Sequence, residues 1–97
     1  MIQTYGLTHI ALAVHDAERS LRFYQQVFGI VEVFREAGFI QAQTPGSRGV
    51  MVFEENAARV GKTGGVMHFG FRLVDPADID AAAAAISSAT ELILSFS

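Results

Sequence analysis

A repeated strand-to-helix motif is the feature of this sequence that most constrains its fold. The stretch His9-Ile-Ala-Leu-Ala-Val-His-Asp16 is matched by His68-Phe-Gly-Phe-Arg-Leu-Val-Asp75, at an offset of 59 residues. Each copy begins with a histidine followed by an apolar stretch of strand length, and an aspartate stands where a helix N-cap is expected. Similarity at a fixed offset indicates one supersecondary unit used twice.

The first copy is predicted to continue into three further strands. We expect a strand from Leu7 to Val14, followed by a helix that Asp16 caps and Gly29 ends. Alternating apolar and polar residues, separated by turn signals, then predict strands over residues 30–36, 39–44 and 49–54. Residues 1–55 therefore read as a complete βαβββ module.

The second copy is predicted to be incomplete. A polar, glycine-rich stretch over residues 56–65 is expected to act as a linker. A strand over Val66–Val74, a helix over Ala77–Ala89 and a strand over Glu91–Phe96 are expected to follow, which gives only a βαβ unit over residues 66–97. The predicted fold class is α+β, with a mixed sheet in a single domain over residues 1–97.

Composition excludes several classes of protein. A chain of 97 residues has the length of one domain, and its lack of cysteine excludes disulfides and cysteine-based zinc sites. The net charge of −3 argues against a nucleic-acid partner, and no apolar run reaches the roughly 18 residues of a membrane span. With no signal-peptide pattern at its start, the chain is expected to be cytoplasmic.

His9 and His68 are the candidate metal ligands, because they occupy equivalent positions in the repeat. Each shares its strand face mainly with small residues, so pseudo-symmetric packing of the copies would direct both imidazoles into one hollow. A purely structural, hydrogen-bonded histidine is an equally good interpretation. Catalytic metal sites usually take three protein ligands, and within the chain Glu54 and Glu55 are candidates for the third.

Further residues are candidates for substrate binding. Gln41 or Gln43, on the third predicted strand, could point into the same hollow as a substrate contact or a weak metal ligand. Arg72 shares the His68 face, where it could pair with an anionic substrate or simply reach solvent. His15, just before the helix cap, is expected at the surface.

These motifs, together with Phe23-Tyr24-Gln-Gln-Val-Phe-Gly29-Ile30, resemble the vicinal oxygen chelate superfamily of glyoxalases, bleomycin resistance proteins and extradiol dioxygenases. The resemblance implies a cup-shaped sheet built from two modules, with His9 and His68 as first-strand ligands of a divalent ion such as Zn, Fe, Mn or Ni. In glyoxalase I a carboxylate ligand stands in the fourth strand, but the corresponding place near Val52 holds none. Three-ligand members take a glutamate from a last strand that this chain does not include.

The resemblance leaves the activity open. It implies a metal-dependent lyase, isomerase, transferase or dioxygenase that acts on a small vicinal-oxygen substrate. The alternatives are a metal-free protein that sequesters a small molecule such as an antibiotic, and a catalytically inactive truncated form. Because an incomplete second module would leave a sheet edge and an apolar face uncovered, a homodimer is expected.

Overall fold

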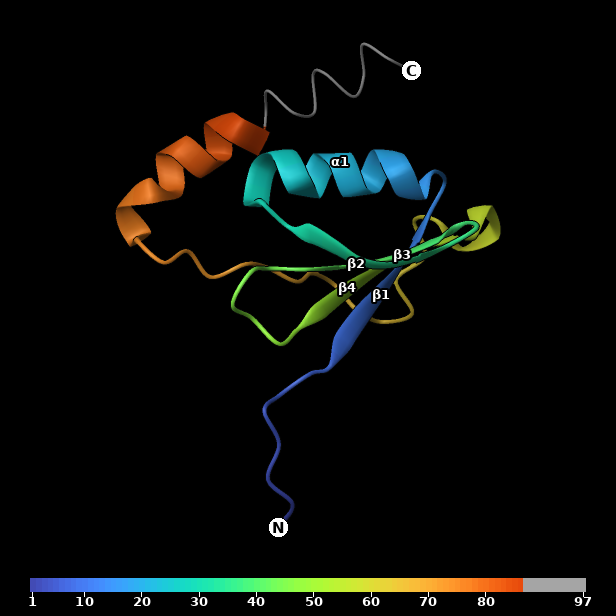
Figure 1. The fold of residues 1–97 in the computed structure, drawn as a ribbon, viewed down its shortest axis with the longest axis horizontal. Helices are drawn as coiled ribbons and strands as arrows, with labels where there is room; N and C mark the ends of the chain where they lie inside the picture. Colours follow the sequence, from blue (N-terminus) through green and yellow to red (C-terminus); the bar gives the residue numbers. More distant parts are fainter. Residues whose placement is uncertain (87–97) are drawn as a thin grey trace.

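The computed structural model describes residues 1–86 and shows an α+β fold in which one helix packs on a four-stranded sheet (Figure 1). Its principal elements are, in chain order, β1 (His9–Val14), α1 (Ala17–Phe28), β2 (Val31–Glu36), β3 (Phe39–Gln43) and β4 (Val50–Glu55). The strand order is β1-β4-β3-β2, with β1 parallel to β4 and the other neighbours antiparallel. The predicted α+β class and the βαβββ module are confirmed, and the sheet is mixed and open rather than closed.

Helix α1 begins and ends at the two residues that the sequence indicates. The Asp16 carboxylate accepts a hydrogen bond from the Arg19 backbone N–H at 3.1 Å, as an N-cap does. Gly29 has φ 66°, and its N–H donates to the Gln25 carbonyl oxygen at 3.0 Å. A residue with a Cβ adopts this left-handed conformation only with strain, so glycine suits the helix end.

The hydrophobic core lies between α1 and one face of the sheet. Phe53, Ile30 and Ile40 are its largest fully buried side chains, and Leu21 of α1 packs onto them. Alternation along β1 directs Ile10 and other even-numbered residues to the same side. The odd-numbered residues of β1 and β3 and the even-numbered residues of β4 are therefore left for the opposite face.

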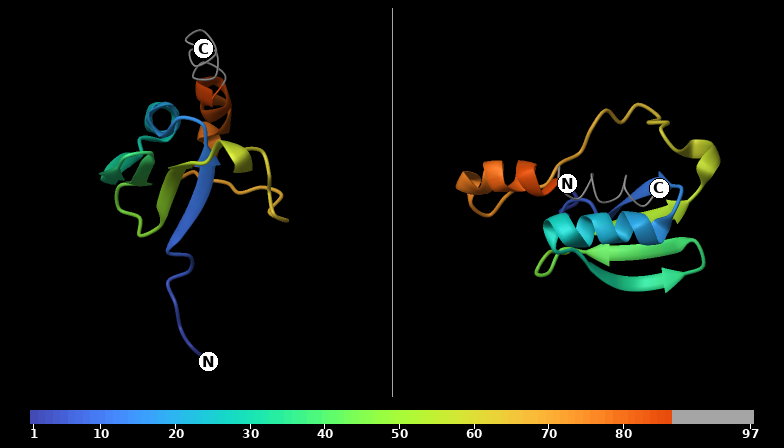
Figure 2. Two further views of the ribbon diagram at one scale, coloured as in Figure 1. Left: turned by 90° about the vertical axis from the view of Figure 1, so that its right-hand side faces the viewer. Right: turned by 90° about the horizontal axis from the view of Figure 1, so that it is seen from above.

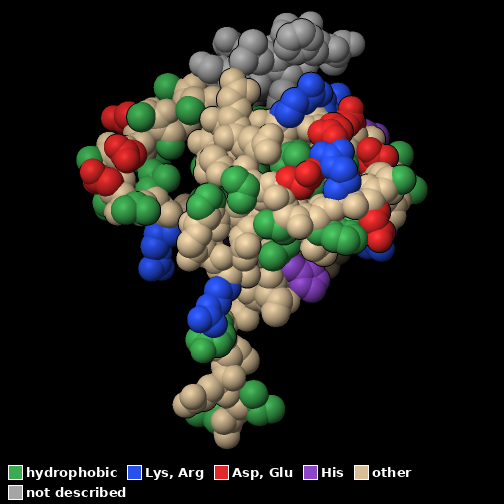
Figure 3. All heavy atoms as spheres, in the orientation of Figure 1, with side chains coloured by type: hydrophobic (Ala, Val, Ile, Leu, Met, Phe, Trp, Pro, Cys, Tyr) green, Lys and Arg blue, Asp and Glu red, His purple; other side chains and the backbone are tan. Residues whose placement is uncertain are grey.

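Ion pairs join α1 to the edge strand β2. The Arg35 guanidinium contacts the carboxylates of Glu18 on α1 and Glu32 on β2. The hydrogen bond from Arg35 lowers the pKa of Glu18, and the two carboxylates raise the pKa of Arg35. Acidic and basic side chains lie intermixed on this side of the molecule (Figure 3). Exposed pairs of this kind contribute little to stability, so the core remains the main source of packing energy.

The second copy of the motif differs from its predicted structure. Residues 66–74 form no strand in the described part of the chain, and the first of them, Val66, donates its N–H to Thr63 within a turn. The predicted strand Val66–Val74 is therefore wrong here, because a strand needs a hydrogen-bonded neighbour that an apolar pattern cannot supply. The predicted second helix begins as a 3₁₀ turn, η2 (Pro76–Asp78), and continues over 79–86. The predicted strand Glu91–Phe96 and the last predicted helical residues, 87–89, lie outside the described residues.

The segment between β4 and η2 runs along the β1 side of the sheet (Figure 2). It starts with a short 3₁₀ helix, η1 (Ala57–Arg59), and then passes beside β1. Phe71 anchors it to α1, since its ring stacks on Phe28 with centroids 4.3 Å apart and lies 6.1 Å from Tyr24. Aromatic packing, rather than a strand ladder, therefore holds this segment in place.

No helix within residues 1–86 combines the length and the apolar character that crossing a membrane requires.

Candidate functional site

Several polar side chains of β1, β3 and β4 lie on the sheet face opposite α1. We call it the open face. Cα partners across β1, β4 and β3 place its side chains in three rows, which are His9 with Val50 and Gln43, Ala11 with Val52 and Gln41, and Ala13 with Glu54 and Phe39.

A groove of about 420 Å³ follows these rows and is called here the open-face groove. Its floor is apolar, because Val52 is only 4% exposed and Ala11 beside it is small. The lining residues are Thr8, His9, Ala11, Phe39, Gln41, Val50, Val52 and Glu54. The structure thus brings two predicted site residues, His9 and Gln41, into one groove.

The His9 ring is held by its neighbour in sequence. The Thr8 hydroxyl oxygen and His9 Nδ1 are 2.8 Å apart, which is hydrogen-bond distance. When Nδ1–H donates to this oxygen, Nε2 carries the free lone pair. The contact therefore orients the ring and prepares Nε2 to accept a hydrogen bond or to coordinate a ligand.

The other two polar side chains of the groove have no hydrogen-bond or ion-pair partner among the described residues. Within residues 1–86, neither the side-chain amide of Gln41 nor the carboxylate of Glu54 forms a hydrogen bond or an ion pair. Gln41 is half-buried and Glu54 is exposed. Both can therefore bind a ligand in the groove without breaking an existing contact.

Glu54 and Glu55, the two carboxylate candidates for a third metal ligand, have different surroundings. Glu54 lines the open-face groove, whereas Glu55 faces the opposite side of the sheet. There its carboxylate accepts a hydrogen bond from the Ala17 backbone N–H at 3.1 Å, at the start of α1. Glu55 thus stabilises a helix terminus. Glu54 shares a groove with His9 but lies at its other end, four residues along β4 from Val50, the Cα partner of His9.

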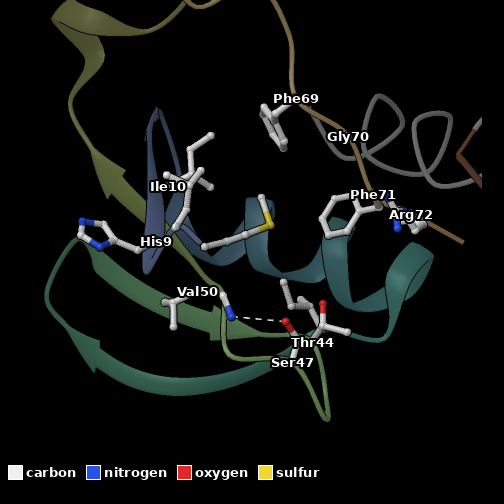
Figure 4. Close-up of a pocket in the computed structure, with 13 residues that line it drawn as sticks. His9, Ile10, Thr44, Ser47, Val50, Phe69, Gly70, Phe71 and Arg72 are labelled. Atoms are coloured by element: carbon white, nitrogen blue, oxygen red, sulfur yellow. Dashed lines mark hydrogen bonds between the residues drawn. The ribbon is translucent and has the colours of Figure 1, made fainter. Parts of the chain in front are cut away.

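A second hollow, also of about 420 Å³, lies where β1 and β4 begin, and we call it the end pocket (Figure 4). Phe69 and Phe71 lie across it from Thr44 and Ser47, while the His9 ring points away from them. Arg72 lines this pocket and Gln41 does not. These two predicted substrate-binding residues therefore lie in different hollows.

His68 lines a third hollow, beside β1, together with Met67, Arg59 and Lys62. None of the three hollows is lined by both His9 and His68. Within the described residues no three His, Cys, Asp or Glu side chains gather where they could hold a metal ion. These residues alone therefore do not form a complete metal centre. His15 is exposed, as expected.

Thr8 and Phe39 are site residues that sequence reasoning missed. Phe39 alternates with Gln41 on β3, so the same strand pattern could have placed it on the open face. Thr8 acts on the ring of its neighbour, and no spacing rule indicates such a contact.

Comparisons with known proteins give one family and one fold. The family model of the Glyoxalase/Bleomycin resistance protein/Dioxygenase superfamily matches residues 6–93. A search of curated proteins finds no significant match.

Several solved structures share the fold. They include the integron cassette protein HFX_CASS4 from the mobile metagenome of the Halifax Harbour sewage outfall, with a TM-score of 0.65 and 23% identity over 88% of this chain and 71% of that one. Lactoylglutathione lyase from Agrobacterium tumefaciens has a TM-score of 0.66 and 20% identity over 89% of this chain and 71% of its own. The fosfomycin resistance protein FosX from Mesorhizobium loti has a TM-score of 0.65 and 21% identity over 91% and 70%.

Proposed function

The chain belongs to the Glyoxalase/Bleomycin resistance protein/Dioxygenase superfamily, and from that premise we propose that it binds a small organic molecule in the open-face groove. His9 and Gln41 are the proposed polar contacts. The observation that carries the proposal is the groove itself, which has an apolar floor. Within residues 1–86 its polar side chains have no hydrogen-bond partner, apart from the Thr8 hydroxyl beside His9. Apolar walls with a few convergent polar groups are typical of small-molecule sites.

Amide chemical shifts would test where small molecules bind. A set of aromatic and aliphatic fragments is titrated into the ¹⁵N-labelled protein, and the shifts are expected to cluster on β1, β3 and β4. The variants His9→Ala and Gln41→Ala should weaken binding of the fragments that respond. His15→Ala is the matched control, because His15 is exposed and lines none of the three hollows. Shifts confined to other surfaces would contradict the proposal.

Metal-dependent chemistry is the second candidate, with His9 and His68 as two of the ligands. The contact between Thr8 and His9 Nδ1 favours it, since a metal-bound histidine usually engages its other ring nitrogen in a hydrogen bond. At least one more donor is needed from outside the described residues. The lyase, isomerase, transferase and dioxygenase activities expected from the sequence depend on this candidate.

Metal content distinguishes the two candidates. The protein is loaded with Zn, Mn, Ni or Fe, desalted and analysed by mass spectrometry for bound metal. Wild type and His15→Ala should retain metal, and the double variant His9→Ala/His68→Ala should lose it. Equal, negligible metal in all three proteins would reject this candidate and leave the metal-free binding protein.

Arg72 remains a proposed contact for an anionic group, now in the end pocket rather than beside Gln41. Charge-assisted hydrogen bonds from a guanidinium suit carboxylates and phosphates. Arg72→Gln should reduce binding of any anionic fragment whose shifts map to the end pocket, with no effect on ligands of the open-face groove.

A further inference from the structure

We propose that the open-face groove selects ligands that join a flat apolar ring to a cationic amino group, with Glu54 as the residue that recognises the charge. The inference rests on the proposed function, because it specifies what kind of small molecule the groove takes.

The charge of the groove comes from one side chain. Among the described residues that line it, Glu54 carries a carboxylate and no lysine or arginine is present. The neighbouring hollows differ, since Arg72 lines the end pocket while Arg59 and Lys62 line the hollow beside His68. Glu54 would repel an anionic ligand, whereas an ammonium group would meet a carboxylate that has no ion-pair partner within residues 1–86.

An aromatic ring stands next to this carboxylate. Phe39 is the Cα partner of Glu54 across the antiparallel pair β3–β4, so both side chains lie on the open face as neighbours. Phe34 meets Phe39 edge-to-face, with ring centroids 6.2 Å apart, which limits how the Phe39 ring can turn. Such a ring can stack on an aromatic ligand and also attract its cationic group.

The spacing of the polar groups sets the ligand's size. Glu54 lies four residues along β4 from Val50, the partner of His9, which is about 13 Å of strand. Gln41 lies in the row between them, where its amide can donate to or accept from a hydroxyl or carbonyl of the ligand. A molecule of one or two rings fits this length.

Three probes that differ only in their polar group test the inference. 2-Phenylethylamine, 2-phenylethanol and phenylacetate are titrated at pH 7, and amide shifts report both the site and the dissociation constant. The amine is expected to bind on the open face about fivefold more tightly than the alcohol, and phenylacetate more weakly still. Glu54→Gln should abolish the preference for the amine. Asp78→Asn removes an equal charge on η2, outside the three hollows, and should preserve it.

The outcomes separate the inference from the proposed function. Open-face shifts with equal affinities for the three probes, or with phenylacetate the tightest, would overturn the charge selection while small-molecule binding stands. A preference that survives Glu54→Gln would also overturn it. If none of the probes shifts open-face amides, both the inference and its premise fail.

Discussion

Glu54 and Glu55 are adjacent residues of β4 whose identical side chains serve opposite faces of the sheet. Alternation directs Glu54 to the open-face groove and Glu55 to the start of α1. The N-terminal end of a helix carries free N–H groups and a partial positive charge, so the Glu55 carboxylate is well placed there. One carboxylate is thus available to a ligand while the other stabilises the fold.

Substituting each residue in turn should separate these roles. Glu55→Gln replaces the charged acceptor of the Ala17 N–H with a neutral one, and should lower the free energy of unfolding by about 1 kcal/mol. Glu54→Gln should change it by less than about 0.5 kcal/mol, because that carboxylate forms no hydrogen bond or ion pair within residues 1–86. Urea unfolding at pH 7 measures both. A larger loss for Glu54→Gln would show that the assignment of roles is wrong.

Tyr24 makes the free energy of unfolding depend on pH in the alkaline range. It packs between Phe28 and Phe53, at centroid distances of 6.2 and 5.3 Å, and burial raises the pKa of its phenol. The folded state therefore retains the proton that the unfolded chain loses near pH 10. This contribution to stability is fully present below that pH and is lost as pH rises through the folded-state pKa.

This loss of stability should appear when the free energy of unfolding is measured as a function of pH. Between pH 9 and 11 the free energy of unfolding of the wild type should fall more steeply than that of Tyr24→Phe. Tyr5→Phe serves as the control, because Tyr5 is 86% exposed, and should retain the wild-type slope. Identical slopes for Tyr24→Phe and wild type in urea titrations would contradict the assignment.

At the level of elements, the sequence predicts what local chemistry determines. Each strand of the first module begins and ends within two residues of its predicted bounds, and Asp16 and Gly29 cap α1 as expected. The alternation of apolar and polar residues and the capping of helices involve only a few neighbouring residues, so a short segment of sequence is enough to predict them. The predicted strand Val66–Val74 fails because its formation depends on a neighbour elsewhere in the chain.

The same reasoning explains how much of the candidate site was predictable. His9 and Gln41 share the open face, as strand periodicity suggested. The separation of Arg72 from Gln41 follows from the path of the segment after β4, which no local pattern encodes. The contact between Glu55 and Ala17 joins residues 38 positions apart, so sequence spacing gives no signal for it.

Phe71 is predicted to hold the segment after β4 against α1. Phe71→Ala removes its stacking on Phe28 and its contact with Tyr24, and should raise the rate of tryptic cleavage after Arg72 about tenfold. Phe69→Ala removes a ring of the same size that makes no ring contact within residues 1–86, and should have a smaller effect. Limited proteolysis with trypsin, followed by mass spectrometry, measures both. Equal effects would show that stacking is not what anchors the segment.

At the scale of the whole molecule, apolar side chains remain at the surface. Leu7 is 85% exposed, Met67 90% and Val66 57%, and all three lie near β1. Strand β1 is at one edge of the sheet, so in the sheet as described it has a hydrogen-bonded neighbour on one side only. Exposed apolar surface beside an edge strand is typical of a surface that associates with another chain.

We therefore expect the protein to form a homodimer. Light scattering after size exclusion should give about twice the 10.5 kDa mass of one chain at micromolar concentration. Leu7→Glu introduces a charge beside β1 and should shift the mass toward the monomer, whereas Glu36→Gln on the distant edge strand β2 should not. A wild type with monomer mass at every concentration tested would reject the dimer.

The parallel pairing of β1 with β4 also predicts an order of events during folding. Strands β2, β3 and β4 are neighbours in the chain and can form as a meander through short turns. Strand β1 must instead wait for residues 50–55, so its pairing closes a loop that contains α1 and two strands. Because such long-range contacts form late and slowly, we expect β1 to be the last of the four strands to join the sheet, so that His9 reaches the groove only at that final step.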